Sequence, residues 1–254
     1  MKIIQIMKTS NKLLVAAVLL LVTAAVVNAL TLKSRFAEMV SSKATRFTEF
    51  PMASFNTVEI SGTAPRNIGK RLHVTVKYAE RVNVRYTALD FIRMELVGET
   101  LKINVDHVKD YETDIKRQPE IIIECPDLIA LTAIGIPLDS LDLPADAHVI
   151  TRRYYQKSQV TIEGFHGAGL NVLAVDGMEV VLDGLTVDSL IARADRAGVV
   201  EIRGNELGHA SLTVGDEATI TLDHTQIGAV STDVADKGQF IVKGAQLTAH
   251  GAHH

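Results

Sequence analysis

The densest group of side chains that could bind a partner combines basic and aromatic residues within a short stretch of the chain. It consists of Arg152, Arg153, Tyr154, Tyr155 and Lys157. Tyr and Arg are enriched where proteins contact their partners most strongly. We therefore predict that these five residues form an interaction patch. The alternative is an ordinary strand that caps the repeats described below.

A second group is an acid column, which we define as Asp176, Asp216 and Asp236, with Arg196 between them. Oxygen ligands of this kind can bind Ca²⁺, and a polysaccharide-cleaving enzyme would also need acids close together on an outer face. Asp at a turn more commonly forms hydrogen bonds with its own backbone. We predict this turn role, no metal site and no cofactor.

Neither the chain end nor any recognisable motif points to catalysis. His250, His253 and His254 could bind Zn²⁺, but the tail offers no fourth ligand, so we predict a frayed end. The chain has no nucleophile elbow, P-loop, dinucleotide fingerprint or HExxH sequence. The glycine-containing segment Gly164–Gly169 is interpreted as a turn. We therefore predict no catalytic residue and a protein that is not an enzyme.

The single cysteine, Cys125, excludes an intrachain disulfide. It ends an apolar run that begins at Ile121. A reactive cysteine needs a nearby base and an electropositive setting, and the neighbouring sequence offers neither. We predict a buried and inert thiol.

The composition favours a thin, repetitive β core. Hydrophobic residues make up 47% of the 254 residues, yet aromatic residues make up only 5% and Trp is absent. The apolar residues are mainly aliphatic and often β-branched, which suits a pleated, half-buried surface. Residues 1–32 hold three lysines and no acid, so the overall net charge of −4 leaves −7 on the remainder. Such a domain is a poor nucleic-acid binder, because phosphates need clustered Lys and Arg.

Residues 13–32 carry no charge and are mostly apolar. About twenty such residues can cross a bilayer as a helix, so we predict a transmembrane signal anchor after a basic region at 1–12 and before a linker at 33–53. The alternative is a signal peptide cleaved after Ala29. Either reading places the main domain on the periplasmic or extracellular side of a bacterial envelope.

A period of twenty residues runs through the C-terminal half. Its clearest copies are Val160–Gly164, Val180–Gly184, Val200–Gly204, Ile220–His224 and Phe240–Gly244. Apolar residues alternate within each copy and again half a period later, which predicts short strands with one inward face. One copy cannot bury that face alone, whereas stacked copies can.

The pattern predicts an all-β fold, a right-handed parallel β-solenoid with rungs of about 20 residues, preceded by the transmembrane helix. We assign the regular solenoid to 126–249, a tail to 250–254 and an N-terminal β region to 54–125. The alternating segments between 54 and 105 could be antiparallel strands or irregular terminal repeats.

One outward position of the repeat carries a charged residue in every copy. These residues, which we call the charge ladder, are Glu163, Asp183, Arg203, Asp223 and Lys243. Three of the four neighbouring pairs have opposite charges. Such pairs stabilise a sheet by about 0.2–1 kcal/mol each, so a solvated ladder explains these acids without catalysis.

Several short motifs resemble a bacterial domain family of unknown function, the putative auto-transporter adhesin head or GIN domain. They are Phe55–Gly62, Gly98–Ile103, Cys125–Leu128 and Gly135, followed by the repeats up to Gly244. The resemblance implies a β-solenoid in the cell envelope and transfers no catalytic site. The Ser-Gly pairs common in the repeats of that family are largely replaced here by charged or bulky residues.

Together these features predict a non-enzymatic binding or structural protein of the cell envelope, with an adhesin-like head. The expected partners are the membrane, through the N-terminal helix, and a glycan, cell-wall component or protein. The alternatives are a carbohydrate-active enzyme on a β-helix scaffold and an envelope sensor or accessory subunit. Fold alone does not decide among them.

Overall fold

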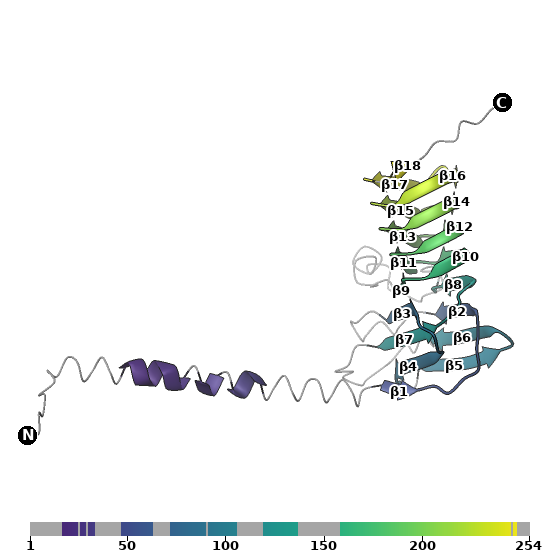
Figure 1. Ribbon diagram of the computed structural model, residues 1–254. Coiled ribbons are helices and arrows are strands. Elements are labelled where there is room, and N and C mark those ends of the chain that lie inside the picture. The colour runs from purple at the N-terminus through teal and green to yellow at the C-terminus, as the bar shows by residue number, and fades with distance from the viewer. Residues whose placement is uncertain are drawn as a thin grey trace, which may run out of the picture. The chain divides into compact units, whose positions relative to one another are not determined.

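A computed structural model describes residues 17–24, 26–28, 30–33, 47–62, 72–89, 91–105, 119–136, 158–244 and 246–247. The chain divides into two compact units, 1–47 and 48–254. Every strand from β2 onward belongs to the second unit (Figure 1).

The predicted transmembrane helix is not found. Helical residues in the first unit are described at 17–24, 26–28 and 30–33, and no helix among the described residues is long and apolar enough to cross a membrane.

The strands form two nine-stranded sheets, here called sheet A and sheet B. Sheet A contains, in spatial order, β1 (Phe47–Glu49), β4 (Asn83–Thr87), β7 (Glu120–Cys125), β3 (His73–Tyr78), β9 (Gln159–Glu163), β11 (Glu179–Asp183), β13 (Val199–Arg203), β15 (Thr219–Asp223) and β17 (Gln239–Lys243). Sheet B contains β18 (Gln246–Leu247), β16 (Gln226–Val234), β14 (Glu206–Val214), β12 (Thr186–Asp195), β10 (His166–Val175), β8 (Ala130–Ile134), β2 (Thr57–Gly62), β6 (Thr100–Val105) and β5 (Ile92–Val97).

The prediction of a right-handed parallel β-solenoid is wrong, because both sheets are mixed and the described strands do not close into a solenoid. In sheet A, β4 runs antiparallel to β7. In sheet B, β5 runs antiparallel to β6 across a two-residue turn that begins at Gly98, whose φ is 61°. The chain also does not stack in sequence order, since β3 lies between β7 and β9 and β2 lies between β6 and β8.

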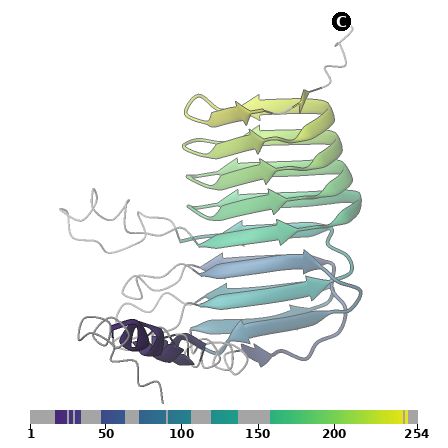
Figure 2. The same cartoon turned by 60° about the vertical axis from the view of Figure 1, so that its left-hand side comes forward.

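The register of the C-terminal strands nevertheless follows the twenty-residue period. Val160 pairs with Val180, which pairs with Val200 in sheet A. In sheet B, Leu170 pairs with Leu190 in the same parallel sense. Figure 2 shows these strands lying one above another. The period therefore sets which residues are neighbours, although it does not set the topology of the whole domain.

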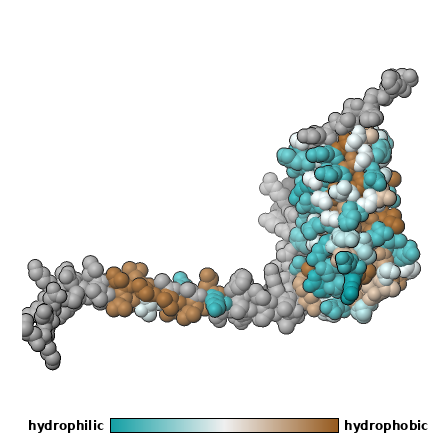
Figure 3. Space-filling view, in the orientation of Figure 1, coloured by the Kyte–Doolittle hydropathy of each residue, from teal (hydrophilic) through white to brown (hydrophobic). Residues whose placement is uncertain are grey.

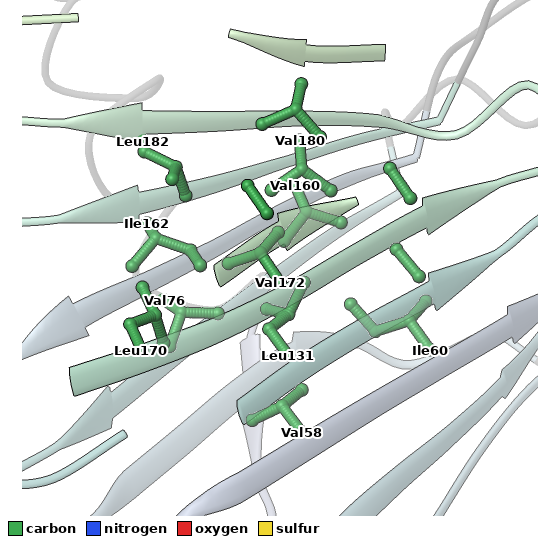
Figure 4. Close-up of a cluster of buried hydrophobic side chains, with 14 of the residues drawn as sticks. Val58, Ile60, Val76, Leu131, Val160, Ile162, Leu170, Val172, Val180 and Leu182 are labelled. Atoms are coloured by element: carbon green, nitrogen blue, oxygen red, sulfur yellow. The ribbon is translucent and has the colours of Figure 1, made fainter. Parts of the chain in front are cut away.

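One hydrophobic core lies between the two sheets. Inward side chains of both sheets are buried in a single cluster, among them Val76, Ile162 and Leu182 from sheet A and Ile60 and Leu131 from sheet B (Figure 4). Full burial of each such side chain contributes about 1.5–3 kcal/mol. The core fixes the strands, and the strands fix the direction of every outward side chain.

The turns from sheet A to sheet B contain the glycine that ends most copies of the twenty-residue repeat. Gly164, Gly184 and Gly204 have φ values of 68°, 63° and 57°, a region that favours glycine. Two buried polar residues follow in later copies. The Leu185 N–H donates to Asn205 Oδ1 at 2.6 Å, and Thr225 Oγ1 donates to the Ile202 carbonyl at 3.0 Å. These side chains satisfy backbone groups that the turn would otherwise leave unpaired.

Candidate functional site

The predicted interaction patch of Arg152, Arg153, Tyr154, Tyr155 and Lys157 lies outside the described residues. The described chain resumes at Ser158, immediately before β9. The patch therefore stays a prediction, and the candidate surfaces below come from the described strands.

Asp176 of the acid column and its neighbour in the repeat, Asp195, form ion pairs at the turns that follow β10 and β12. Arg196 Nε and Nη2 donate to the two carboxylate oxygens of Asp176, at 2.7 and 2.9 Å. The Asp195 carboxylate accepts from Arg193 Nη2 and from the Arg196 backbone N–H, both at 3.0 Å. The bidentate contact with Asp176, followed by its charge, raises the pKa of Arg196. The Asp176 carboxylate thus joins two successive turns, whereas Asp195 forms bonds within its own turn.

Within the described ranges, no group of three or more His, Cys, Asp or Glu side chains is arranged to hold a metal ion. Asp176 binds a guanidinium instead of its own backbone, so the predicted turn role is right about the location and wrong about the bonding partner. Asp195, which the prediction did not include in the column, is the residue whose carboxylate accepts from a turn N–H.

The charge ladder is confirmed by the register of sheet A and is longer than predicted. Its five residues pair in order across β9, β11, β13, β15 and β17. Glu163 pairs on its other side with Lys77, Lys77 pairs with Glu124, and Glu124 pairs with Asn83. The repeat pattern does not predict this extension of the ladder, because β3 is inserted between β7 and β9.

The part of the ladder that extends beyond Glu163 contains an acid with several side-chain partners, Glu124. Glu124 accepts from Lys77 Nζ at 3.0 Å, from Asn83 Nδ2 at 2.9 Å and from Arg85 Nη2 at 3.4 Å. Burial alone raises the pKa of the Glu124 carboxyl, but the hydrogen bonds and positive charges outweigh it. The pKa of Glu124 therefore lies below its usual value.

Within the ladder, Arg203 forms its hydrogen bond along its own strand, to Glu201 Oε2 at 2.5 Å. That bond, with the charges of Glu201, Asp183 and Asp223, raises the pKa of Arg203 against the effect of burial. Every basic residue of the ladder pairs with at least one acid, and the like-charged pair is Glu163 with Asp183.

A different surface lies where the strands of sheet B begin. Tyr78, at the end of β3, packs its ring 4.5 Å from the His166 ring and 6.2 Å from the Phe165 ring, nearly perpendicular to the latter. Phe165 is buried, whereas Tyr78 is 40% exposed. This contact is not predictable from the sequence pattern, because Tyr78 and His166 lie on strands from different parts of the chain.

His166 is also the first member of an exposed row. It pairs with Thr186, Thr186 with Glu206, and Glu206 with Gln226, on four successive strands. We call these four residues the rim row, and all four are exposed. The members of the row are twenty residues apart, but their types differ, so the spacing alone does not mark them as a site.

The outer face of sheet B carries an exposed isoleucine. Ile191 on β12 is 52% exposed, and its paired neighbours Asn171 and Ser211 are small polar residues. Figure 3 shows hydrophobic surface beside β10 and β12. A single exposed Ile among polar neighbours is ordinary for a protein surface, so we do not assign a site to it.

No family model matches this chain, and no curated protein matches it. The chain is similar to a solved "putative adhesin" from Bacteroides fragilis, with 13% identity and a TM-score of 0.49, covering 79% of this chain and 94% of the other. A "putative adhesin" from Parabacteroides distasonis has 11% identity and a TM-score of 0.41, covering 79% and 95%.

A "putative lipid binding protein" from Parabacteroides distasonis has 12% identity and a TM-score of 0.37, covering 79% of this chain and 94% of the other. These likenesses are too distant to transfer a partner or a function. The resemblance to the GIN domain family stays a prediction from the motifs.

Proposed function

We propose that this protein is a non-enzymatic binding protein of the bacterial cell envelope, with an adhesin-like head formed by residues 48–254. The observation that carries the proposal is the aromatic contact of Tyr78 with His166 at the start of the rim row. An exposed Tyr held in place by neighbouring rings offers a large contact area with little loss of side-chain entropy on binding.

The setting of the rim row supports a binding role. Its side chains project from paired strands, so the backbone positions that carry them are fixed before any partner arrives. Sites on rigid strands lose less freedom on binding than sites on mobile loops. The surface is thus preorganised for a partner that follows the stacking direction.

The envelope location rests on the sequence. The basic start and the uncharged segment at 13–32 resemble a secretory signal with small residues at Val27-Asn28-Ala29. Adhesion also occurs in the names of the similar structures, but they are too distant to support the proposal.

The alternative of a carbohydrate-active enzyme needs two carboxyl groups about 5–9.5 Å apart that can act on a substrate. Asp176 is instead held by both donors of Arg196, and Asp195 by Arg193 and a backbone N–H. These two acids therefore give that alternative no support.

The proposal is tested by retention of the purified full chain on separated envelope fractions: cell-wall material, glycans and membrane proteins. We expect retention on at least one fraction, and its loss in a variant carrying both Tyr78→Ala and His166→Ala. The matched control is Ile191→Ala, which alters an exposed side chain of another face. Retention on no fraction, or equal retention of the double variant, would contradict the proposed binding role.

The location is tested separately by adding protease to intact cells that express a tagged chain, and to cells whose outer barrier has been opened. Cleavage on intact cells places the domain at the surface. Protection until the barrier is opened places it in the periplasm and rules out direct adhesion. Protection even after the outer barrier is opened would contradict export.

A further inference from the structure

We propose that Tyr78 and the rim row form a saccharide-binding site. Tyr78 and His166 would pack against the apolar face of one sugar ring. Thr186 and Glu206 would form hydrogen bonds with hydroxyl groups of the units that follow. This inference rests on the proposed binding function and names the chemical class of its partner.

Strand pairing and ring packing hold the aromatic end of the site in place. Lys77 pairs with Glu163, so the next residue on β3, Tyr78, lies beside the turn that leads to Phe165 and His166. The buried Phe165 ring meets the Tyr78 ring at 88°, an edge contact that fixes the tyrosine. Part of the Tyr78 ring remains open to solvent, with 40% of the residue exposed.

The remaining groups of the row have free hydrogen-bonding capacity. Within the described part of the chain, the side chains of Thr186, Glu206 and Gln226 form no hydrogen bond or ion pair. A hydroxyl, a carboxylate and an amide together supply both donors and acceptors. Sugar hydroxyl groups also act as both donor and acceptor, so this mixture is complementary to them.

The turn beside the row leaves room for a ligand. A Cβ atom added at Gly164, Gly184 or Gly204 would meet no atom within 4 Å. In the next copy this position is occupied by His224, whose imidazole would lie 3.1 Å from a Cβ at Gly244. The open stretch therefore runs from His166 to Glu206 and ends at His224.

The dimensions suit a short oligosaccharide. Parallel strands lie about 4.8 Å apart, so two steps from His166 to Glu206 span roughly 10 Å. The groups recur at a constant interval because the pairing is in register. A partner with regularly spaced hydroxyl groups, such as a glycan chain along the stack, can use several members of the row at once.

Other ligand classes fit the row less well. It contains no Lys or Arg, so it lacks the groups that bind phosphate or nucleic acid. Its members after His166 are polar, so it offers little of the apolar surface that an amphipathic helix or an acyl chain needs. One aromatic contact followed by uncharged and acidic hydrogen-bonding groups favours a neutral saccharide.

The test uses the purified full chain and three neutral probes: chito-, cello- and malto-oligosaccharides up to the hexasaccharide. Binding is measured by saturation-transfer NMR and by calorimetry. We expect at least one series to bind, and Tyr78→Ala to weaken that binding about tenfold, which corresponds to about 1.4 kcal/mol. Tyr78→Phe keeps the ring and should retain most of the affinity, and Ile191→Ala should bind as the unaltered chain does.

Glu206→Gln provides a second probe of the row, since it keeps the shape of the side chain and changes its hydrogen bonding. We expect a smaller loss of affinity than for Tyr78→Ala. Binding of no probe, or binding that neither substitution changes, overturns the saccharide assignment. The proposed function fails separately, by absence of retention on every envelope fraction. Retention on a deglycosylated protein fraction that requires Tyr78 would sustain the binding role and reject the saccharide.

Discussion

The guanidinium of Arg196 forms a bidentate ion pair with the carboxylate of Asp176, which lies one copy of the repeat earlier in the chain. Both residues have positive φ, 44° and 55°, so the ion pair joins two turns whose backbones are in the left-handed region. The Asp176 side chain is only 5% exposed, whereas that of Arg196 is 62% exposed. Loss of the ion pair should therefore cost more free energy at the nearly buried carboxylate than at the exposed guanidinium.

Removing Arg196 should destabilise the domain more than removing a neighbouring arginine. Arg196→Ala leaves the nearly buried carboxylate of Asp176 without its charged partner, which is more costly than losing an exposed pair. Arg193→Ala is the matched control, because Arg193 bonds to the more exposed Asp195. We expect Tm from circular dichroism to fall by a few degrees for Arg196→Ala and to change little for Arg193→Ala. Equal Tm values would show that the pair does not hold the turns.

Burial in the core predicts that two isoleucines contribute very differently to the free energy of unfolding. Ile202 is fully buried between Leu182 and Leu222 of the neighbouring strands, whereas Ile191 is 52% exposed. Ile202→Ala should lower the free energy of unfolding by about 2–4 kcal/mol, from lost burial and the cavity left behind. Ile191→Ala should have only a small effect. Urea denaturation measures both, and a similar loss at the two sites would contradict the assignment of the faces.

A buried asparagine beside a turn should contribute to stability through hydrogen bonds rather than through packing. Asn205 accepts from the Leu185 N–H at 2.6 Å and donates to the Leu182 carbonyl at 3.1 Å. Asn205→Ala leaves both backbone groups without that partner, which should cost about 1–3 kcal/mol. Asn171→Ala, at an exposed position of β10, is the control. If urea denaturation gave the same stability for both variants, the two hydrogen bonds would contribute nothing net.

The local features of this fold were predictable because they repeat. The twenty-residue period predicted which residues pair in the C-terminal strands, such as Asp183 with Arg203. It also indicated that the glycine ending each clear copy, for example Gly184, recurs at one place in the fold, and there the chain turns with positive φ. Each of these depends on residues one period apart, where the sequence pattern is direct evidence of proximity.

The topology and the rim site were not predictable in the same way. Lys77 and Glu163 become neighbours because β3 enters sheet A between β7 and β9, a pairing that no local period encodes. The contact of Tyr78 with His166 follows from that insertion. The antiparallel pair of β5 and β6 arises because a hairpin turn at Gly98 reverses the chain, which alternation alone does not distinguish from a parallel step.

The predicted inert thiol of Cys125 agrees with its burial and leads to a labelling experiment. Burial, with the nearby charge of Asp127, raises the pKa of the Cys125 thiol to about 12. The reactive thiolate is therefore almost absent near pH 8. We expect a thiol reagent to modify the folded chain very slowly and one thiol per chain after unfolding in urea. Rapid labelling of the folded chain would show that the strand end at β7 opens readily.

The lowered pKa of Glu124 makes the stability of the domain depend on pH in a defined direction. A carboxyl whose pKa is lower in the folded state stabilises that state above its ordinary pKa of 4.5, and the contribution disappears as the pH falls through the lower folded value. Glu124→Gln should therefore be less stable than the unaltered chain at pH 7, and the difference should shrink once the pH falls below about 4.5.

Lys77→Gln separates this effect from general acid sensitivity. It removes the donor at 3.0 Å and its charge, so the pKa of Glu124 should rise toward its ordinary value. The loss of stability that Glu124 causes on acidification should then be smaller than in the unaltered chain and should be complete at a higher pH. Urea denaturation repeated between neutral and acidic pH measures all three proteins. A stability difference for Glu124→Gln that is independent of pH would mean that the bonds to Lys77, Asn83 and Arg85 do not favour the charged form in the folded state.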